Sequence, residues 1–184
     1  MLDANVLIPS VLRDTLLRGV DAELYMVRWS KEILDEMERN LVAALGLDPE
    51  KAARLRRHME RVFPEAEVVG YGRHEQNLLN DSKDRHVVAV ALESRASLVV
   101  THNLRDFVPM PEGIAAVSPD VFLTQVIADC PNAVLRLLAS QARDMTRPPV
   151  TLDALLGWLS RPCPQFVEAV RVHRALGSDS NEID

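Results

Sequence analysis

Aromatic residues are scarce in this sequence. Phe, Trp and Tyr make up only 4% of the 184 residues, whereas apolar residues make up 47%. A core is therefore expected to consist mainly of Leu, Val and Ala side chains. This composition is typical of a globular chain and excludes an intrinsically disordered one. The length is sufficient for one compact domain, or for one domain with a helical appendage.

Long apolar runs and paired cysteines are also missing. No run approaches the roughly 20 residues that a bilayer span needs, so we expect no membrane partner. The start, MLDANVLIPSVLRD, has no positively charged leader before an apolar segment, which is unlike a signal peptide. The two cysteines, Cys130 and Cys163, match no metal-ligand spacing. We expect both to be reduced thiols in a cytoplasmic protein.

Basic residues are fewer than acidic ones, with 21 Lys and Arg against 27 Asp and Glu. The net charge of −6 argues against attraction to nucleic acid or anionic membrane over the whole surface. A local basic face is still allowed, and Arg54, Arg57 and Arg61 form a stripe on the helix expected from Pro49. A solvated helix face is the simpler interpretation of this stripe. Contact with phosphates remains the alternative.

One stretch organises the rest of the chain: residues 78–107, LLNDSKDRHVVAVALESRASLVVTHNLRDF. It predicts a turn, a helix at 83–94, a strand at 97–101 and a second turn. Asp84 lies at the start of the helix, whereas Asn103 and Asp106 follow the strand. In an α/β fold these places can meet at the carboxyl edge of a parallel sheet, where ligands usually bind.

Strands and helices are expected to alternate over the first part of the chain. Strands are predicted at 1–9 (running into a loop), 22–27, 66–70, 97–101 and 114–117. Helices are predicted at 9–19, from 31, from 49 and at 83–94, the second of them capped by Ser30. This alternation indicates a parallel sheet covered on both faces, ending near residue 120.

No strand signal follows residue 120. Helices are predicted at 121–129, 132–145, 152–159 and 164–176, and the polar tail 177–184 is expected to fray. We therefore predict a sheet domain at 1–120 and a helical C-terminal extension at 121–184.

Each candidate acid has a purely structural alternative. Asp3 after an apolar segment could begin a turn, and with only two residues before it, either the first strand is clipped or residues have been lost upstream. Glu36 and Glu38 both flank the apolar face of their helix, and their spacing does not choose between them.

The candidates near the middle of the chain also have structural alternatives. Asp84 could belong to a capping box with Asp81. Asn103 and Asp106 could simply form a turn. Acids that converge on one crevice would instead indicate a hard cation.

Four motifs in a fixed order resemble a known family. DANVL, WSKEILDEMERNL, NDSKDRHVVAVAL and LVVTHNLRDF, within residues 1–120, are similar to the PIN domain, specifically to VapC-like toxins of toxin–antitoxin pairs. The helical remainder resembles an extension carried by some of these proteins. The resemblance implies a three-layer α/β/α sandwich with a central parallel sheet. It also implies a metal-dependent ribonuclease.

The resemblance assigns roles by position. Asp3, Glu36 and Asp84 become the metal-binding acids, and a fourth polar position is shared between Asn103 and Asp106. It is the resemblance that selects Glu36 over Glu38. Asn103 stands where many relatives have an acid, which leaves the number of metals open. The catalytic acids implied are Asp3, Glu36, Asp84 and Asp106.

The implied chemistry is hydrolysis of RNA by water activated on Mg²⁺ or Mn²⁺. Asn5 and Thr101 would position water or a phosphate oxygen beside the acids. Single-stranded or looped RNA is the expected substrate. The implied partners are a cognate antitoxin and a second copy in a homodimer. Contacts to the RNA backbone are expected from Arg54, Arg57, Arg61, Lys83 and Arg85.

Two other classes of protein remain as alternatives. Aspartyl phosphatases also use an Asp after the first strand, but they need a second acid two residues later, where this chain has Asn5. A PIN-like module that binds RNA or protein without cleaving is the other alternative. The retained Asp3, Glu36 and Asp84 argue against it, whereas Asn103 and the short first strand argue for it.

Overall fold

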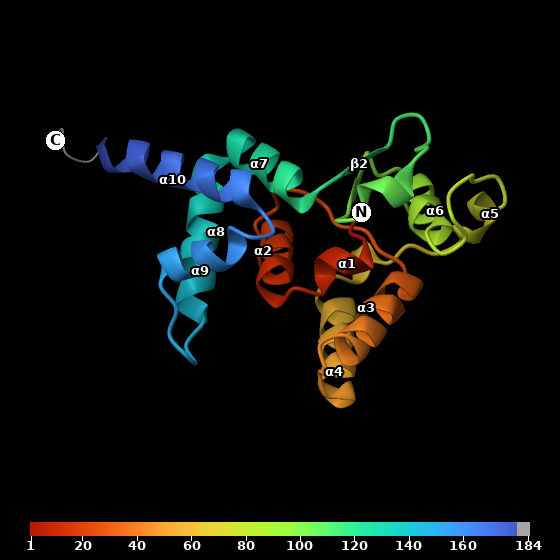
Figure 1. The fold of residues 1–184 in the computed structure, drawn as a ribbon, viewed down its shortest axis with the longest axis horizontal. Helices are drawn as coiled ribbons and strands as arrows, with labels where there is room; N and C mark the ends of the chain where they lie inside the picture. Colours follow the sequence, from red (N-terminus) through yellow and green to blue (C-terminus); the bar gives the residue numbers. More distant parts are fainter. Residues whose placement is uncertain (180–184) are drawn as a thin grey trace. The chain divides into compact units, whose positions relative to one another are not determined.

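The chain forms two compact units, which are described separately here. The structure, a computed structural model, describes residues 1–179, so positions 180–184 of the predicted tail lie outside it (Figure 1). The first unit contains residues 1–9 and 26–118, and the second contains residues 10–25 together with the chain from Pro119 onward.

The sheet of the first unit is small and parallel. Strand β1 (Leu98–Val100) pairs with β2 (Ala115–Val117), with Leu98 opposite Ala115. Single parallel bridges extend the pairing, from Leu2 to Val100 and from Trp29 to Glu67. The Leu2 N–H also donates to the carbonyl of Arg28 at 3.1 Å. A hydrogen-bonded array of extended segments therefore runs through the unit, although only two segments are regular strands.

Regular structure is thus mostly helical, with a parallel sheet of two strands. The prediction of a strand at 22–27 is wrong, because the β-bridge in this part of the chain forms later, at Trp29. Glu23 has a φ of +57°, a left-handed conformation that cannot continue a strand. The expected first strand is limited to the bridge at Leu2, since helix α1 (Ala4–Leu7) begins directly after Asp3. The three-layer sandwich remains a prediction.

Two long helices of the first unit begin where the sequence predicts. In α3 (Lys31–Ala43), the Ser30 hydroxyl accepts a hydrogen bond from the Ile33 N–H at 3.3 Å, and the apolar face is buried. In α4 (Pro49–Val62), the Asp48 side chain accepts from the Lys51 N–H at 3.1 Å. These caps satisfy N–H groups that a helix leaves unpaired at its start.

The remaining helices of this unit are shorter. Helix α6 (Arg85–Glu93) buries Val87, Val88 and the residues up to Ala91, so it is enclosed on nearly all sides. Three short elements were not predicted. They are η1 (Pro64–Ala66), α5 (Gly72–Glu75) and η2 (Leu104–Phe107). The first of them takes the beginning of the strand expected at 66–70, of which only the bridge at Glu67 forms.

The second unit is a helical bundle that includes an early segment of the chain. Helix α2 (Ser10–Asp21) packs against α8 (Pro131–Asp144) and α9 (Leu152–Leu159). Helix α7 (Pro119–Asp129) packs against α10 (Pro164–Asp179). The helices predicted beyond residue 120 are therefore confirmed. The domain boundary near residue 120 remains a prediction, to which the structure adds that residues 10–25 group with the C-terminal helices.

Buried polar contacts fix the pairing of these helices. The Thr15 hydroxyl donates to Oε1 of Gln141 at 2.9 Å, and Nε2 of Gln141 donates to the Val11 carbonyl at 3.1 Å. Oδ1 of Asp120 accepts from the Phe166 N–H at 2.9 Å, near the start of α10. A buried amide or carboxylate is costly unless it is hydrogen-bonded, so these pairs specify one arrangement.

Within residues 1–179, no single helix is long and apolar enough to cross a membrane. Helices α7 and α8 meet the criteria only together, as a pair bent by 119°. Cys130 and Cys163 are both free thiols, as expected. Burial raises the pKa of the Cys163 thiol to about 12.

Candidate functional site

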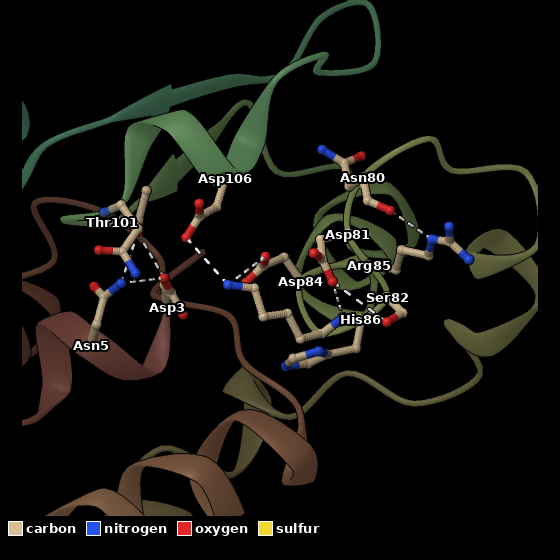
Figure 2. A network of polar contacts seen from close by, with 12 residues as sticks. Asp3, Asn5, Asn80, Asp81, Ser82, Asp84, Arg85, His86, Thr101 and Asp106 are labelled. Carbon is tan, nitrogen blue, oxygen red and sulfur yellow. Dashed lines mark hydrogen bonds and ion pairs between the residues drawn. The ribbon is translucent and has the colours of Figure 1, made fainter.

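Asp3 is the most tightly anchored of the candidate acids. It is buried, and its Oδ2 accepts hydrogen bonds from the Thr101 hydroxyl at 2.6 Å and from the Asn5 amide at 2.7 Å (Figure 2). Thr101 directly follows β1, and the bridge between Leu2 and Val100 brings the two segments together. The predicted supporting residues, Asn5 and Thr101, therefore both contact Asp3.

The position of Asp3 has an electrostatic cost. Burial raises the pKa of its carboxyl group. The hydrogen bond from Thr101 opposes this increase, as do the N–H groups of Ala4 and Asn5. Burial therefore disfavours the charged form of Asp3, and these donors offset part of that cost.

Asp84 does not take the capping role that its spacing allows. Helix α6 begins at Arg85, two residues later than expected, because Oδ1 of Asp81 accepts from the Lys83 N–H at 3.2 Å and forms a turn. The Asp84 side chain makes no capping hydrogen bond. Its Oδ2 is buried and has no hydrogen-bond partner. The capping box is therefore not formed, and one carboxylate oxygen of Asp84 remains available.

Asp106 and Asp84 share one cation. Nζ of Lys83 lies 3.8 Å from Oδ2 of Asp84 and 3.8 Å from Oδ2 of Asp106, beyond hydrogen-bonding distance. The pKa of Asp84 is raised by burial, lowered by Lys83, and raised again by the charges of Asp106 and Asp3. Figure 2 shows Asp3, Asp84 and Asp106 reaching one region from different segments of the chain.

The structure separates Glu36 from Glu38, which the helical spacing could not do. Oε2 of Glu36 lies 3.8 Å from Nε2 of His86. Burial raises the pKa of Glu36, and the charges of Asp3 and Asp84 raise it further. Oε2 of Glu38 instead pairs with Arg56 of α4 at 3.2 Å. Glu36 therefore faces the acids, whereas Glu38 holds two helices together.

No hydrogen bond in the described chain links the side chain of Asn103 to the acids, so its role as a ligand stays a prediction. Its backbone N–H donates to the Thr101 hydroxyl at 3.0 Å, while the residue itself is exposed. Of the two candidates for the fourth position, Asp106 is the one placed beside Asp84. In the described part of the chain, no group of three or more His, Cys, Asp or Glu side chains is arranged to hold a metal ion as the side chains stand.

The basic residues predicted to contact RNA differ in how far they are exposed and in whether they already have partners. Arg54, Arg57 and Arg61 are exposed on α4, although Arg57 pairs with Glu50 at 2.8 Å. Lys83 is also exposed, whereas Nε of Arg85 donates to the Asn80 carbonyl at 2.7 Å. The sequence did not single out Arg56. Its guanidinium pairs with Asp35, Glu38 and Glu60, so Arg56 is engaged in ion pairs within the protein and is not part of the exposed stripe of Arg54, Arg57 and Arg61.

The donor set nevertheless fits a hard divalent cation. Carboxylate oxygens are the ligands that Mg²⁺ prefers, and Asp84 offers one that makes no hydrogen bond within the described chain. Burial is the main cause of the raised pKa values of Asp3, Glu36 and Asp84, and the charges of neighbouring acids raise those of Glu36 and Asp84 further. A positive ion beside them would lower all three pKa values. Asp3, Glu36, Asp84 and Asp106 are the residues that would hold the ion.

The chain belongs to the PIN domain family. The family model described as "PIN domain" matches residues 1–105, and a second, described as "VapC50 C-terminal domain", matches residues 119–172. The chain is also 35% identical, over 95 residues, to the protein named "Putative ribonuclease VapC50" of Mycobacterium tuberculosis (strain ATCC 25618 / H37Rv). That match covers 50% of this chain and 56% of the relative. No solved structure gives a significant match.

Proposed function

We propose that this chain is a Mg²⁺- or Mn²⁺-dependent endoribonuclease and the toxin of a type II toxin–antitoxin pair. The observation that carries the proposal is that Asp3, Glu36, Asp84 and Asp106 come from separate segments, and that the charge of Asp3 acts on both Glu36 and Asp84 while that of Asp106 acts on Asp84. Membership of the PIN domain family and the likeness to the relative named as a ribonuclease support it. The expected sandwich fold and a cytoplasmic location belong to the same proposal.

A bound divalent ion would supply a water of lowered pKa and positive charge beside the scissile phosphate. Asp3 contributes a carboxylate that Thr101 and Asn5 hold in one orientation. Asp84 contributes an oxygen with no competing hydrogen bond. Lys83, whose Nζ lies 3.8 Å from Oδ2 of Asp84 and from Oδ2 of Asp106, would be close enough to these acids to contact a phosphate of bound RNA. No nucleophilic side chain is required.

RNA is the proposed substrate, with Arg54, Arg57, Arg61, Lys83 and Arg85 as contacts to its backbone. The proposed partners are a cognate antitoxin and a second copy of the chain. A basic side chain of the antitoxin would suit the acidic site for the same electrostatic reason that Lys83 does.

The test compares wild type with Asp84→Asn on total RNA, with Mg²⁺, with Mn²⁺ and with chelator. Asp81→Asn is the matched control, because Asp81 is an exposed acid three residues earlier and its amide can still accept from the Lys83 N–H. We expect metal-dependent cleavage by wild type and Asp81→Asn, and none by Asp84→Asn. Intact RNA in every sample would favour the PIN-like binding module instead. Cleavage that survives in Asp84→Asn would show that the site is wrongly assigned.

A further inference from the structure

His86 is a buried polar side chain without an adequate partner. It lies in the first turn of α6, and only 6% of its surface is exposed. Its Nε2 is buried and makes no hydrogen bond within the described chain. The sequence did not distinguish it from an ordinary packing histidine. Such an unsatisfied group is rare in native proteins and calls for an explanation, such as a catalytic role or a bound water or ion.

The group nearest to this nitrogen is a candidate metal ligand. Nε2 of His86 lies 3.8 Å from Oε2 of Glu36, a distance too long for a direct hydrogen bond. The Glu36 carboxylate itself makes no hydrogen bond to any described residue, and its side chain is 37% exposed. A small rotation of this side chain, or one bridging water, would join the two groups.

His86 is also coupled to the rest of the site. It lies two residues after Asp84, whose Oδ2 is likewise buried and makes no hydrogen bond within the described chain. Its charge lowers the pKa values of both Asp3 and Glu36. Figure 2 shows His86 in the helix that follows Asp84. Two unsatisfied atoms at the start of one helix therefore border the same group of acids.

From this geometry we infer that His86 is a positioning residue, whose Nε2–H donates to Glu36 and orients that carboxylate toward a bound divalent ion. Carboxylates that bind metals are commonly held by such an outer hydrogen bond, and losing it typically weakens metal affinity by about 10- to 100-fold. The inference rests on the proposed metal-dependent function and adds a residue that the carried-over set does not contain.

The experiment measures Mn²⁺ binding to the whole protein without RNA, from the electron paramagnetic resonance signal of free Mn²⁺. His86→Leu removes the donor while keeping an apolar side chain that can fill the space. His86→Gln keeps an N–H donor at a comparable reach. Asp84→Asn reports whether the binding occurs at this site. Urea unfolding of each variant, without metal, separates a positioning role from a packing role.

We expect His86→Leu to weaken Mn²⁺ binding by about 10- to 100-fold. We expect it to unfold at no lower urea concentration than wild type, because an unsatisfied buried nitrogen has been removed. His86→Gln should restore most of the affinity. Wild-type affinity in His86→Leu would overturn the inference and leave the proposed function standing. A lowered unfolding midpoint in His86→Leu without rescue by His86→Gln would also overturn it. No Mn²⁺ binding by wild type would instead overturn the proposed function itself.

Discussion

The Thr101 hydroxyl donates a 2.6 Å hydrogen bond to Oδ2 of Asp3, across 98 positions of the chain. The same hydroxyl accepts from the Asn5 amide at 2.9 Å and from the Asn103 N–H at 3.0 Å. Thr101 is completely buried. This one side chain therefore ties the start of the chain, the end of β1 and the following turn to a carboxylate that burial would otherwise destabilise.

Thr101→Val should destabilise the protein by about 1.5–3 kcal/mol, because the isosteric side chain leaves a buried carboxylate without its strongest donor. Urea unfolding monitored by Trp29 fluorescence, in a Trp158→Phe background, would measure the change. Thr124→Val is the matched control, since the Thr124 hydroxyl is buried and has no hydrogen-bond partner in the described chain. Because Thr124 lies in the second unit, its effect is followed through Trp158 in a Trp29→Phe background. The control should be nearly neutral or stabilising. Equal losses in the two variants would contradict a special role for the contact with Asp3.

The stability of the metal-free protein should depend on the charge of Asp84. Its pKa is raised above the ordinary 3.8, first by burial and then by Asp106 and Asp3. The native state therefore keeps this proton to a higher pH than the unfolded chain does. The free energy of unfolding falls as pH rises from about 3.8 through the raised pKa, and the loss is complete above it.

Asp84→Asn removes this penalty. We expect the variant and wild type to unfold at the same urea concentration below pH 3.8, and the variant to become the more stable as pH rises to neutrality. The measurement is a series of urea midpoints from acid to neutral pH in the presence of chelator. Added Mn²⁺ should reverse the order, because only wild type gains stability from binding the ion. A difference that stays constant over the whole pH range would contradict the assignment to a titrating group.

The sequence predicted the helices well because their signals are local. Ser30 caps α3 as expected, and the apolar face of that helix is buried. The strands were harder, since much of their pairing consists of single bridges such as Trp29 with Glu67. Such a bridge depends on which distant segment lies alongside, and no local pattern records that information.

The candidate site shows the same limit. Asp3 and Asp84 directly precede helices α1 and α6, and the sequence predicts both residues at element boundaries. Helical spacing could not choose between Glu36 and Glu38, and only the resemblance favoured Glu36; the geometric reason lies in the partner helix, because Arg56 of α4 pairs with Glu38 while Glu36 lies beside His86. The unsatisfied nitrogen of His86 was invisible in the sequence for a similar reason. Satisfaction of a buried group is a property of its three-dimensional neighbours.

The exposed arginines of α4 should set the salt dependence of RNA binding. Each phosphate contact on a single strand contributes about 0.7 to the slope of log affinity against log salt. Combined replacement of Arg54, Arg57 and Arg61 by Ala should therefore lower the slope by about 2, if all three contact phosphates. Binding of a single-stranded RNA is measured by fluorescence anisotropy in chelator, so that no cleavage occurs.

The matched control removes three exposed arginines from the second unit: Arg136, Arg143 and Arg171. It changes the net charge equally, so it should leave the slope close to the wild-type value. A comparable drop in both triple variants would show that overall charge, and not a local basic face, controls the binding.

Replacing Gly19 by Ala should destabilise the protein, although Ala usually stabilises a helix relative to Gly. Gly19 lies within α2, where Gly→Ala normally stabilises by about 1 kcal/mol. A Cβ at this position would approach Cζ of Tyr25 to 2.6 Å. Tyr25 cannot easily yield, because its hydroxyl donates to the Leu16 carbonyl at 2.7 Å and its ring packs edge-on against Phe122.

We therefore expect Gly19→Ala to destabilise the second unit by about 1–3 kcal/mol, the usual cost of overpacking. Gly157→Ala is the matched control, since it lies within α9 and an added Cβ would meet nothing within 4 Å. It should stabilise by about 0.5–1 kcal/mol. Urea unfolding followed through Trp158, in a Trp29→Phe background, measures both variants. Stabilisation by both substitutions would show that Tyr25 moves aside, and that its contacts with Leu16 and Phe122 contribute little to the packing of this unit.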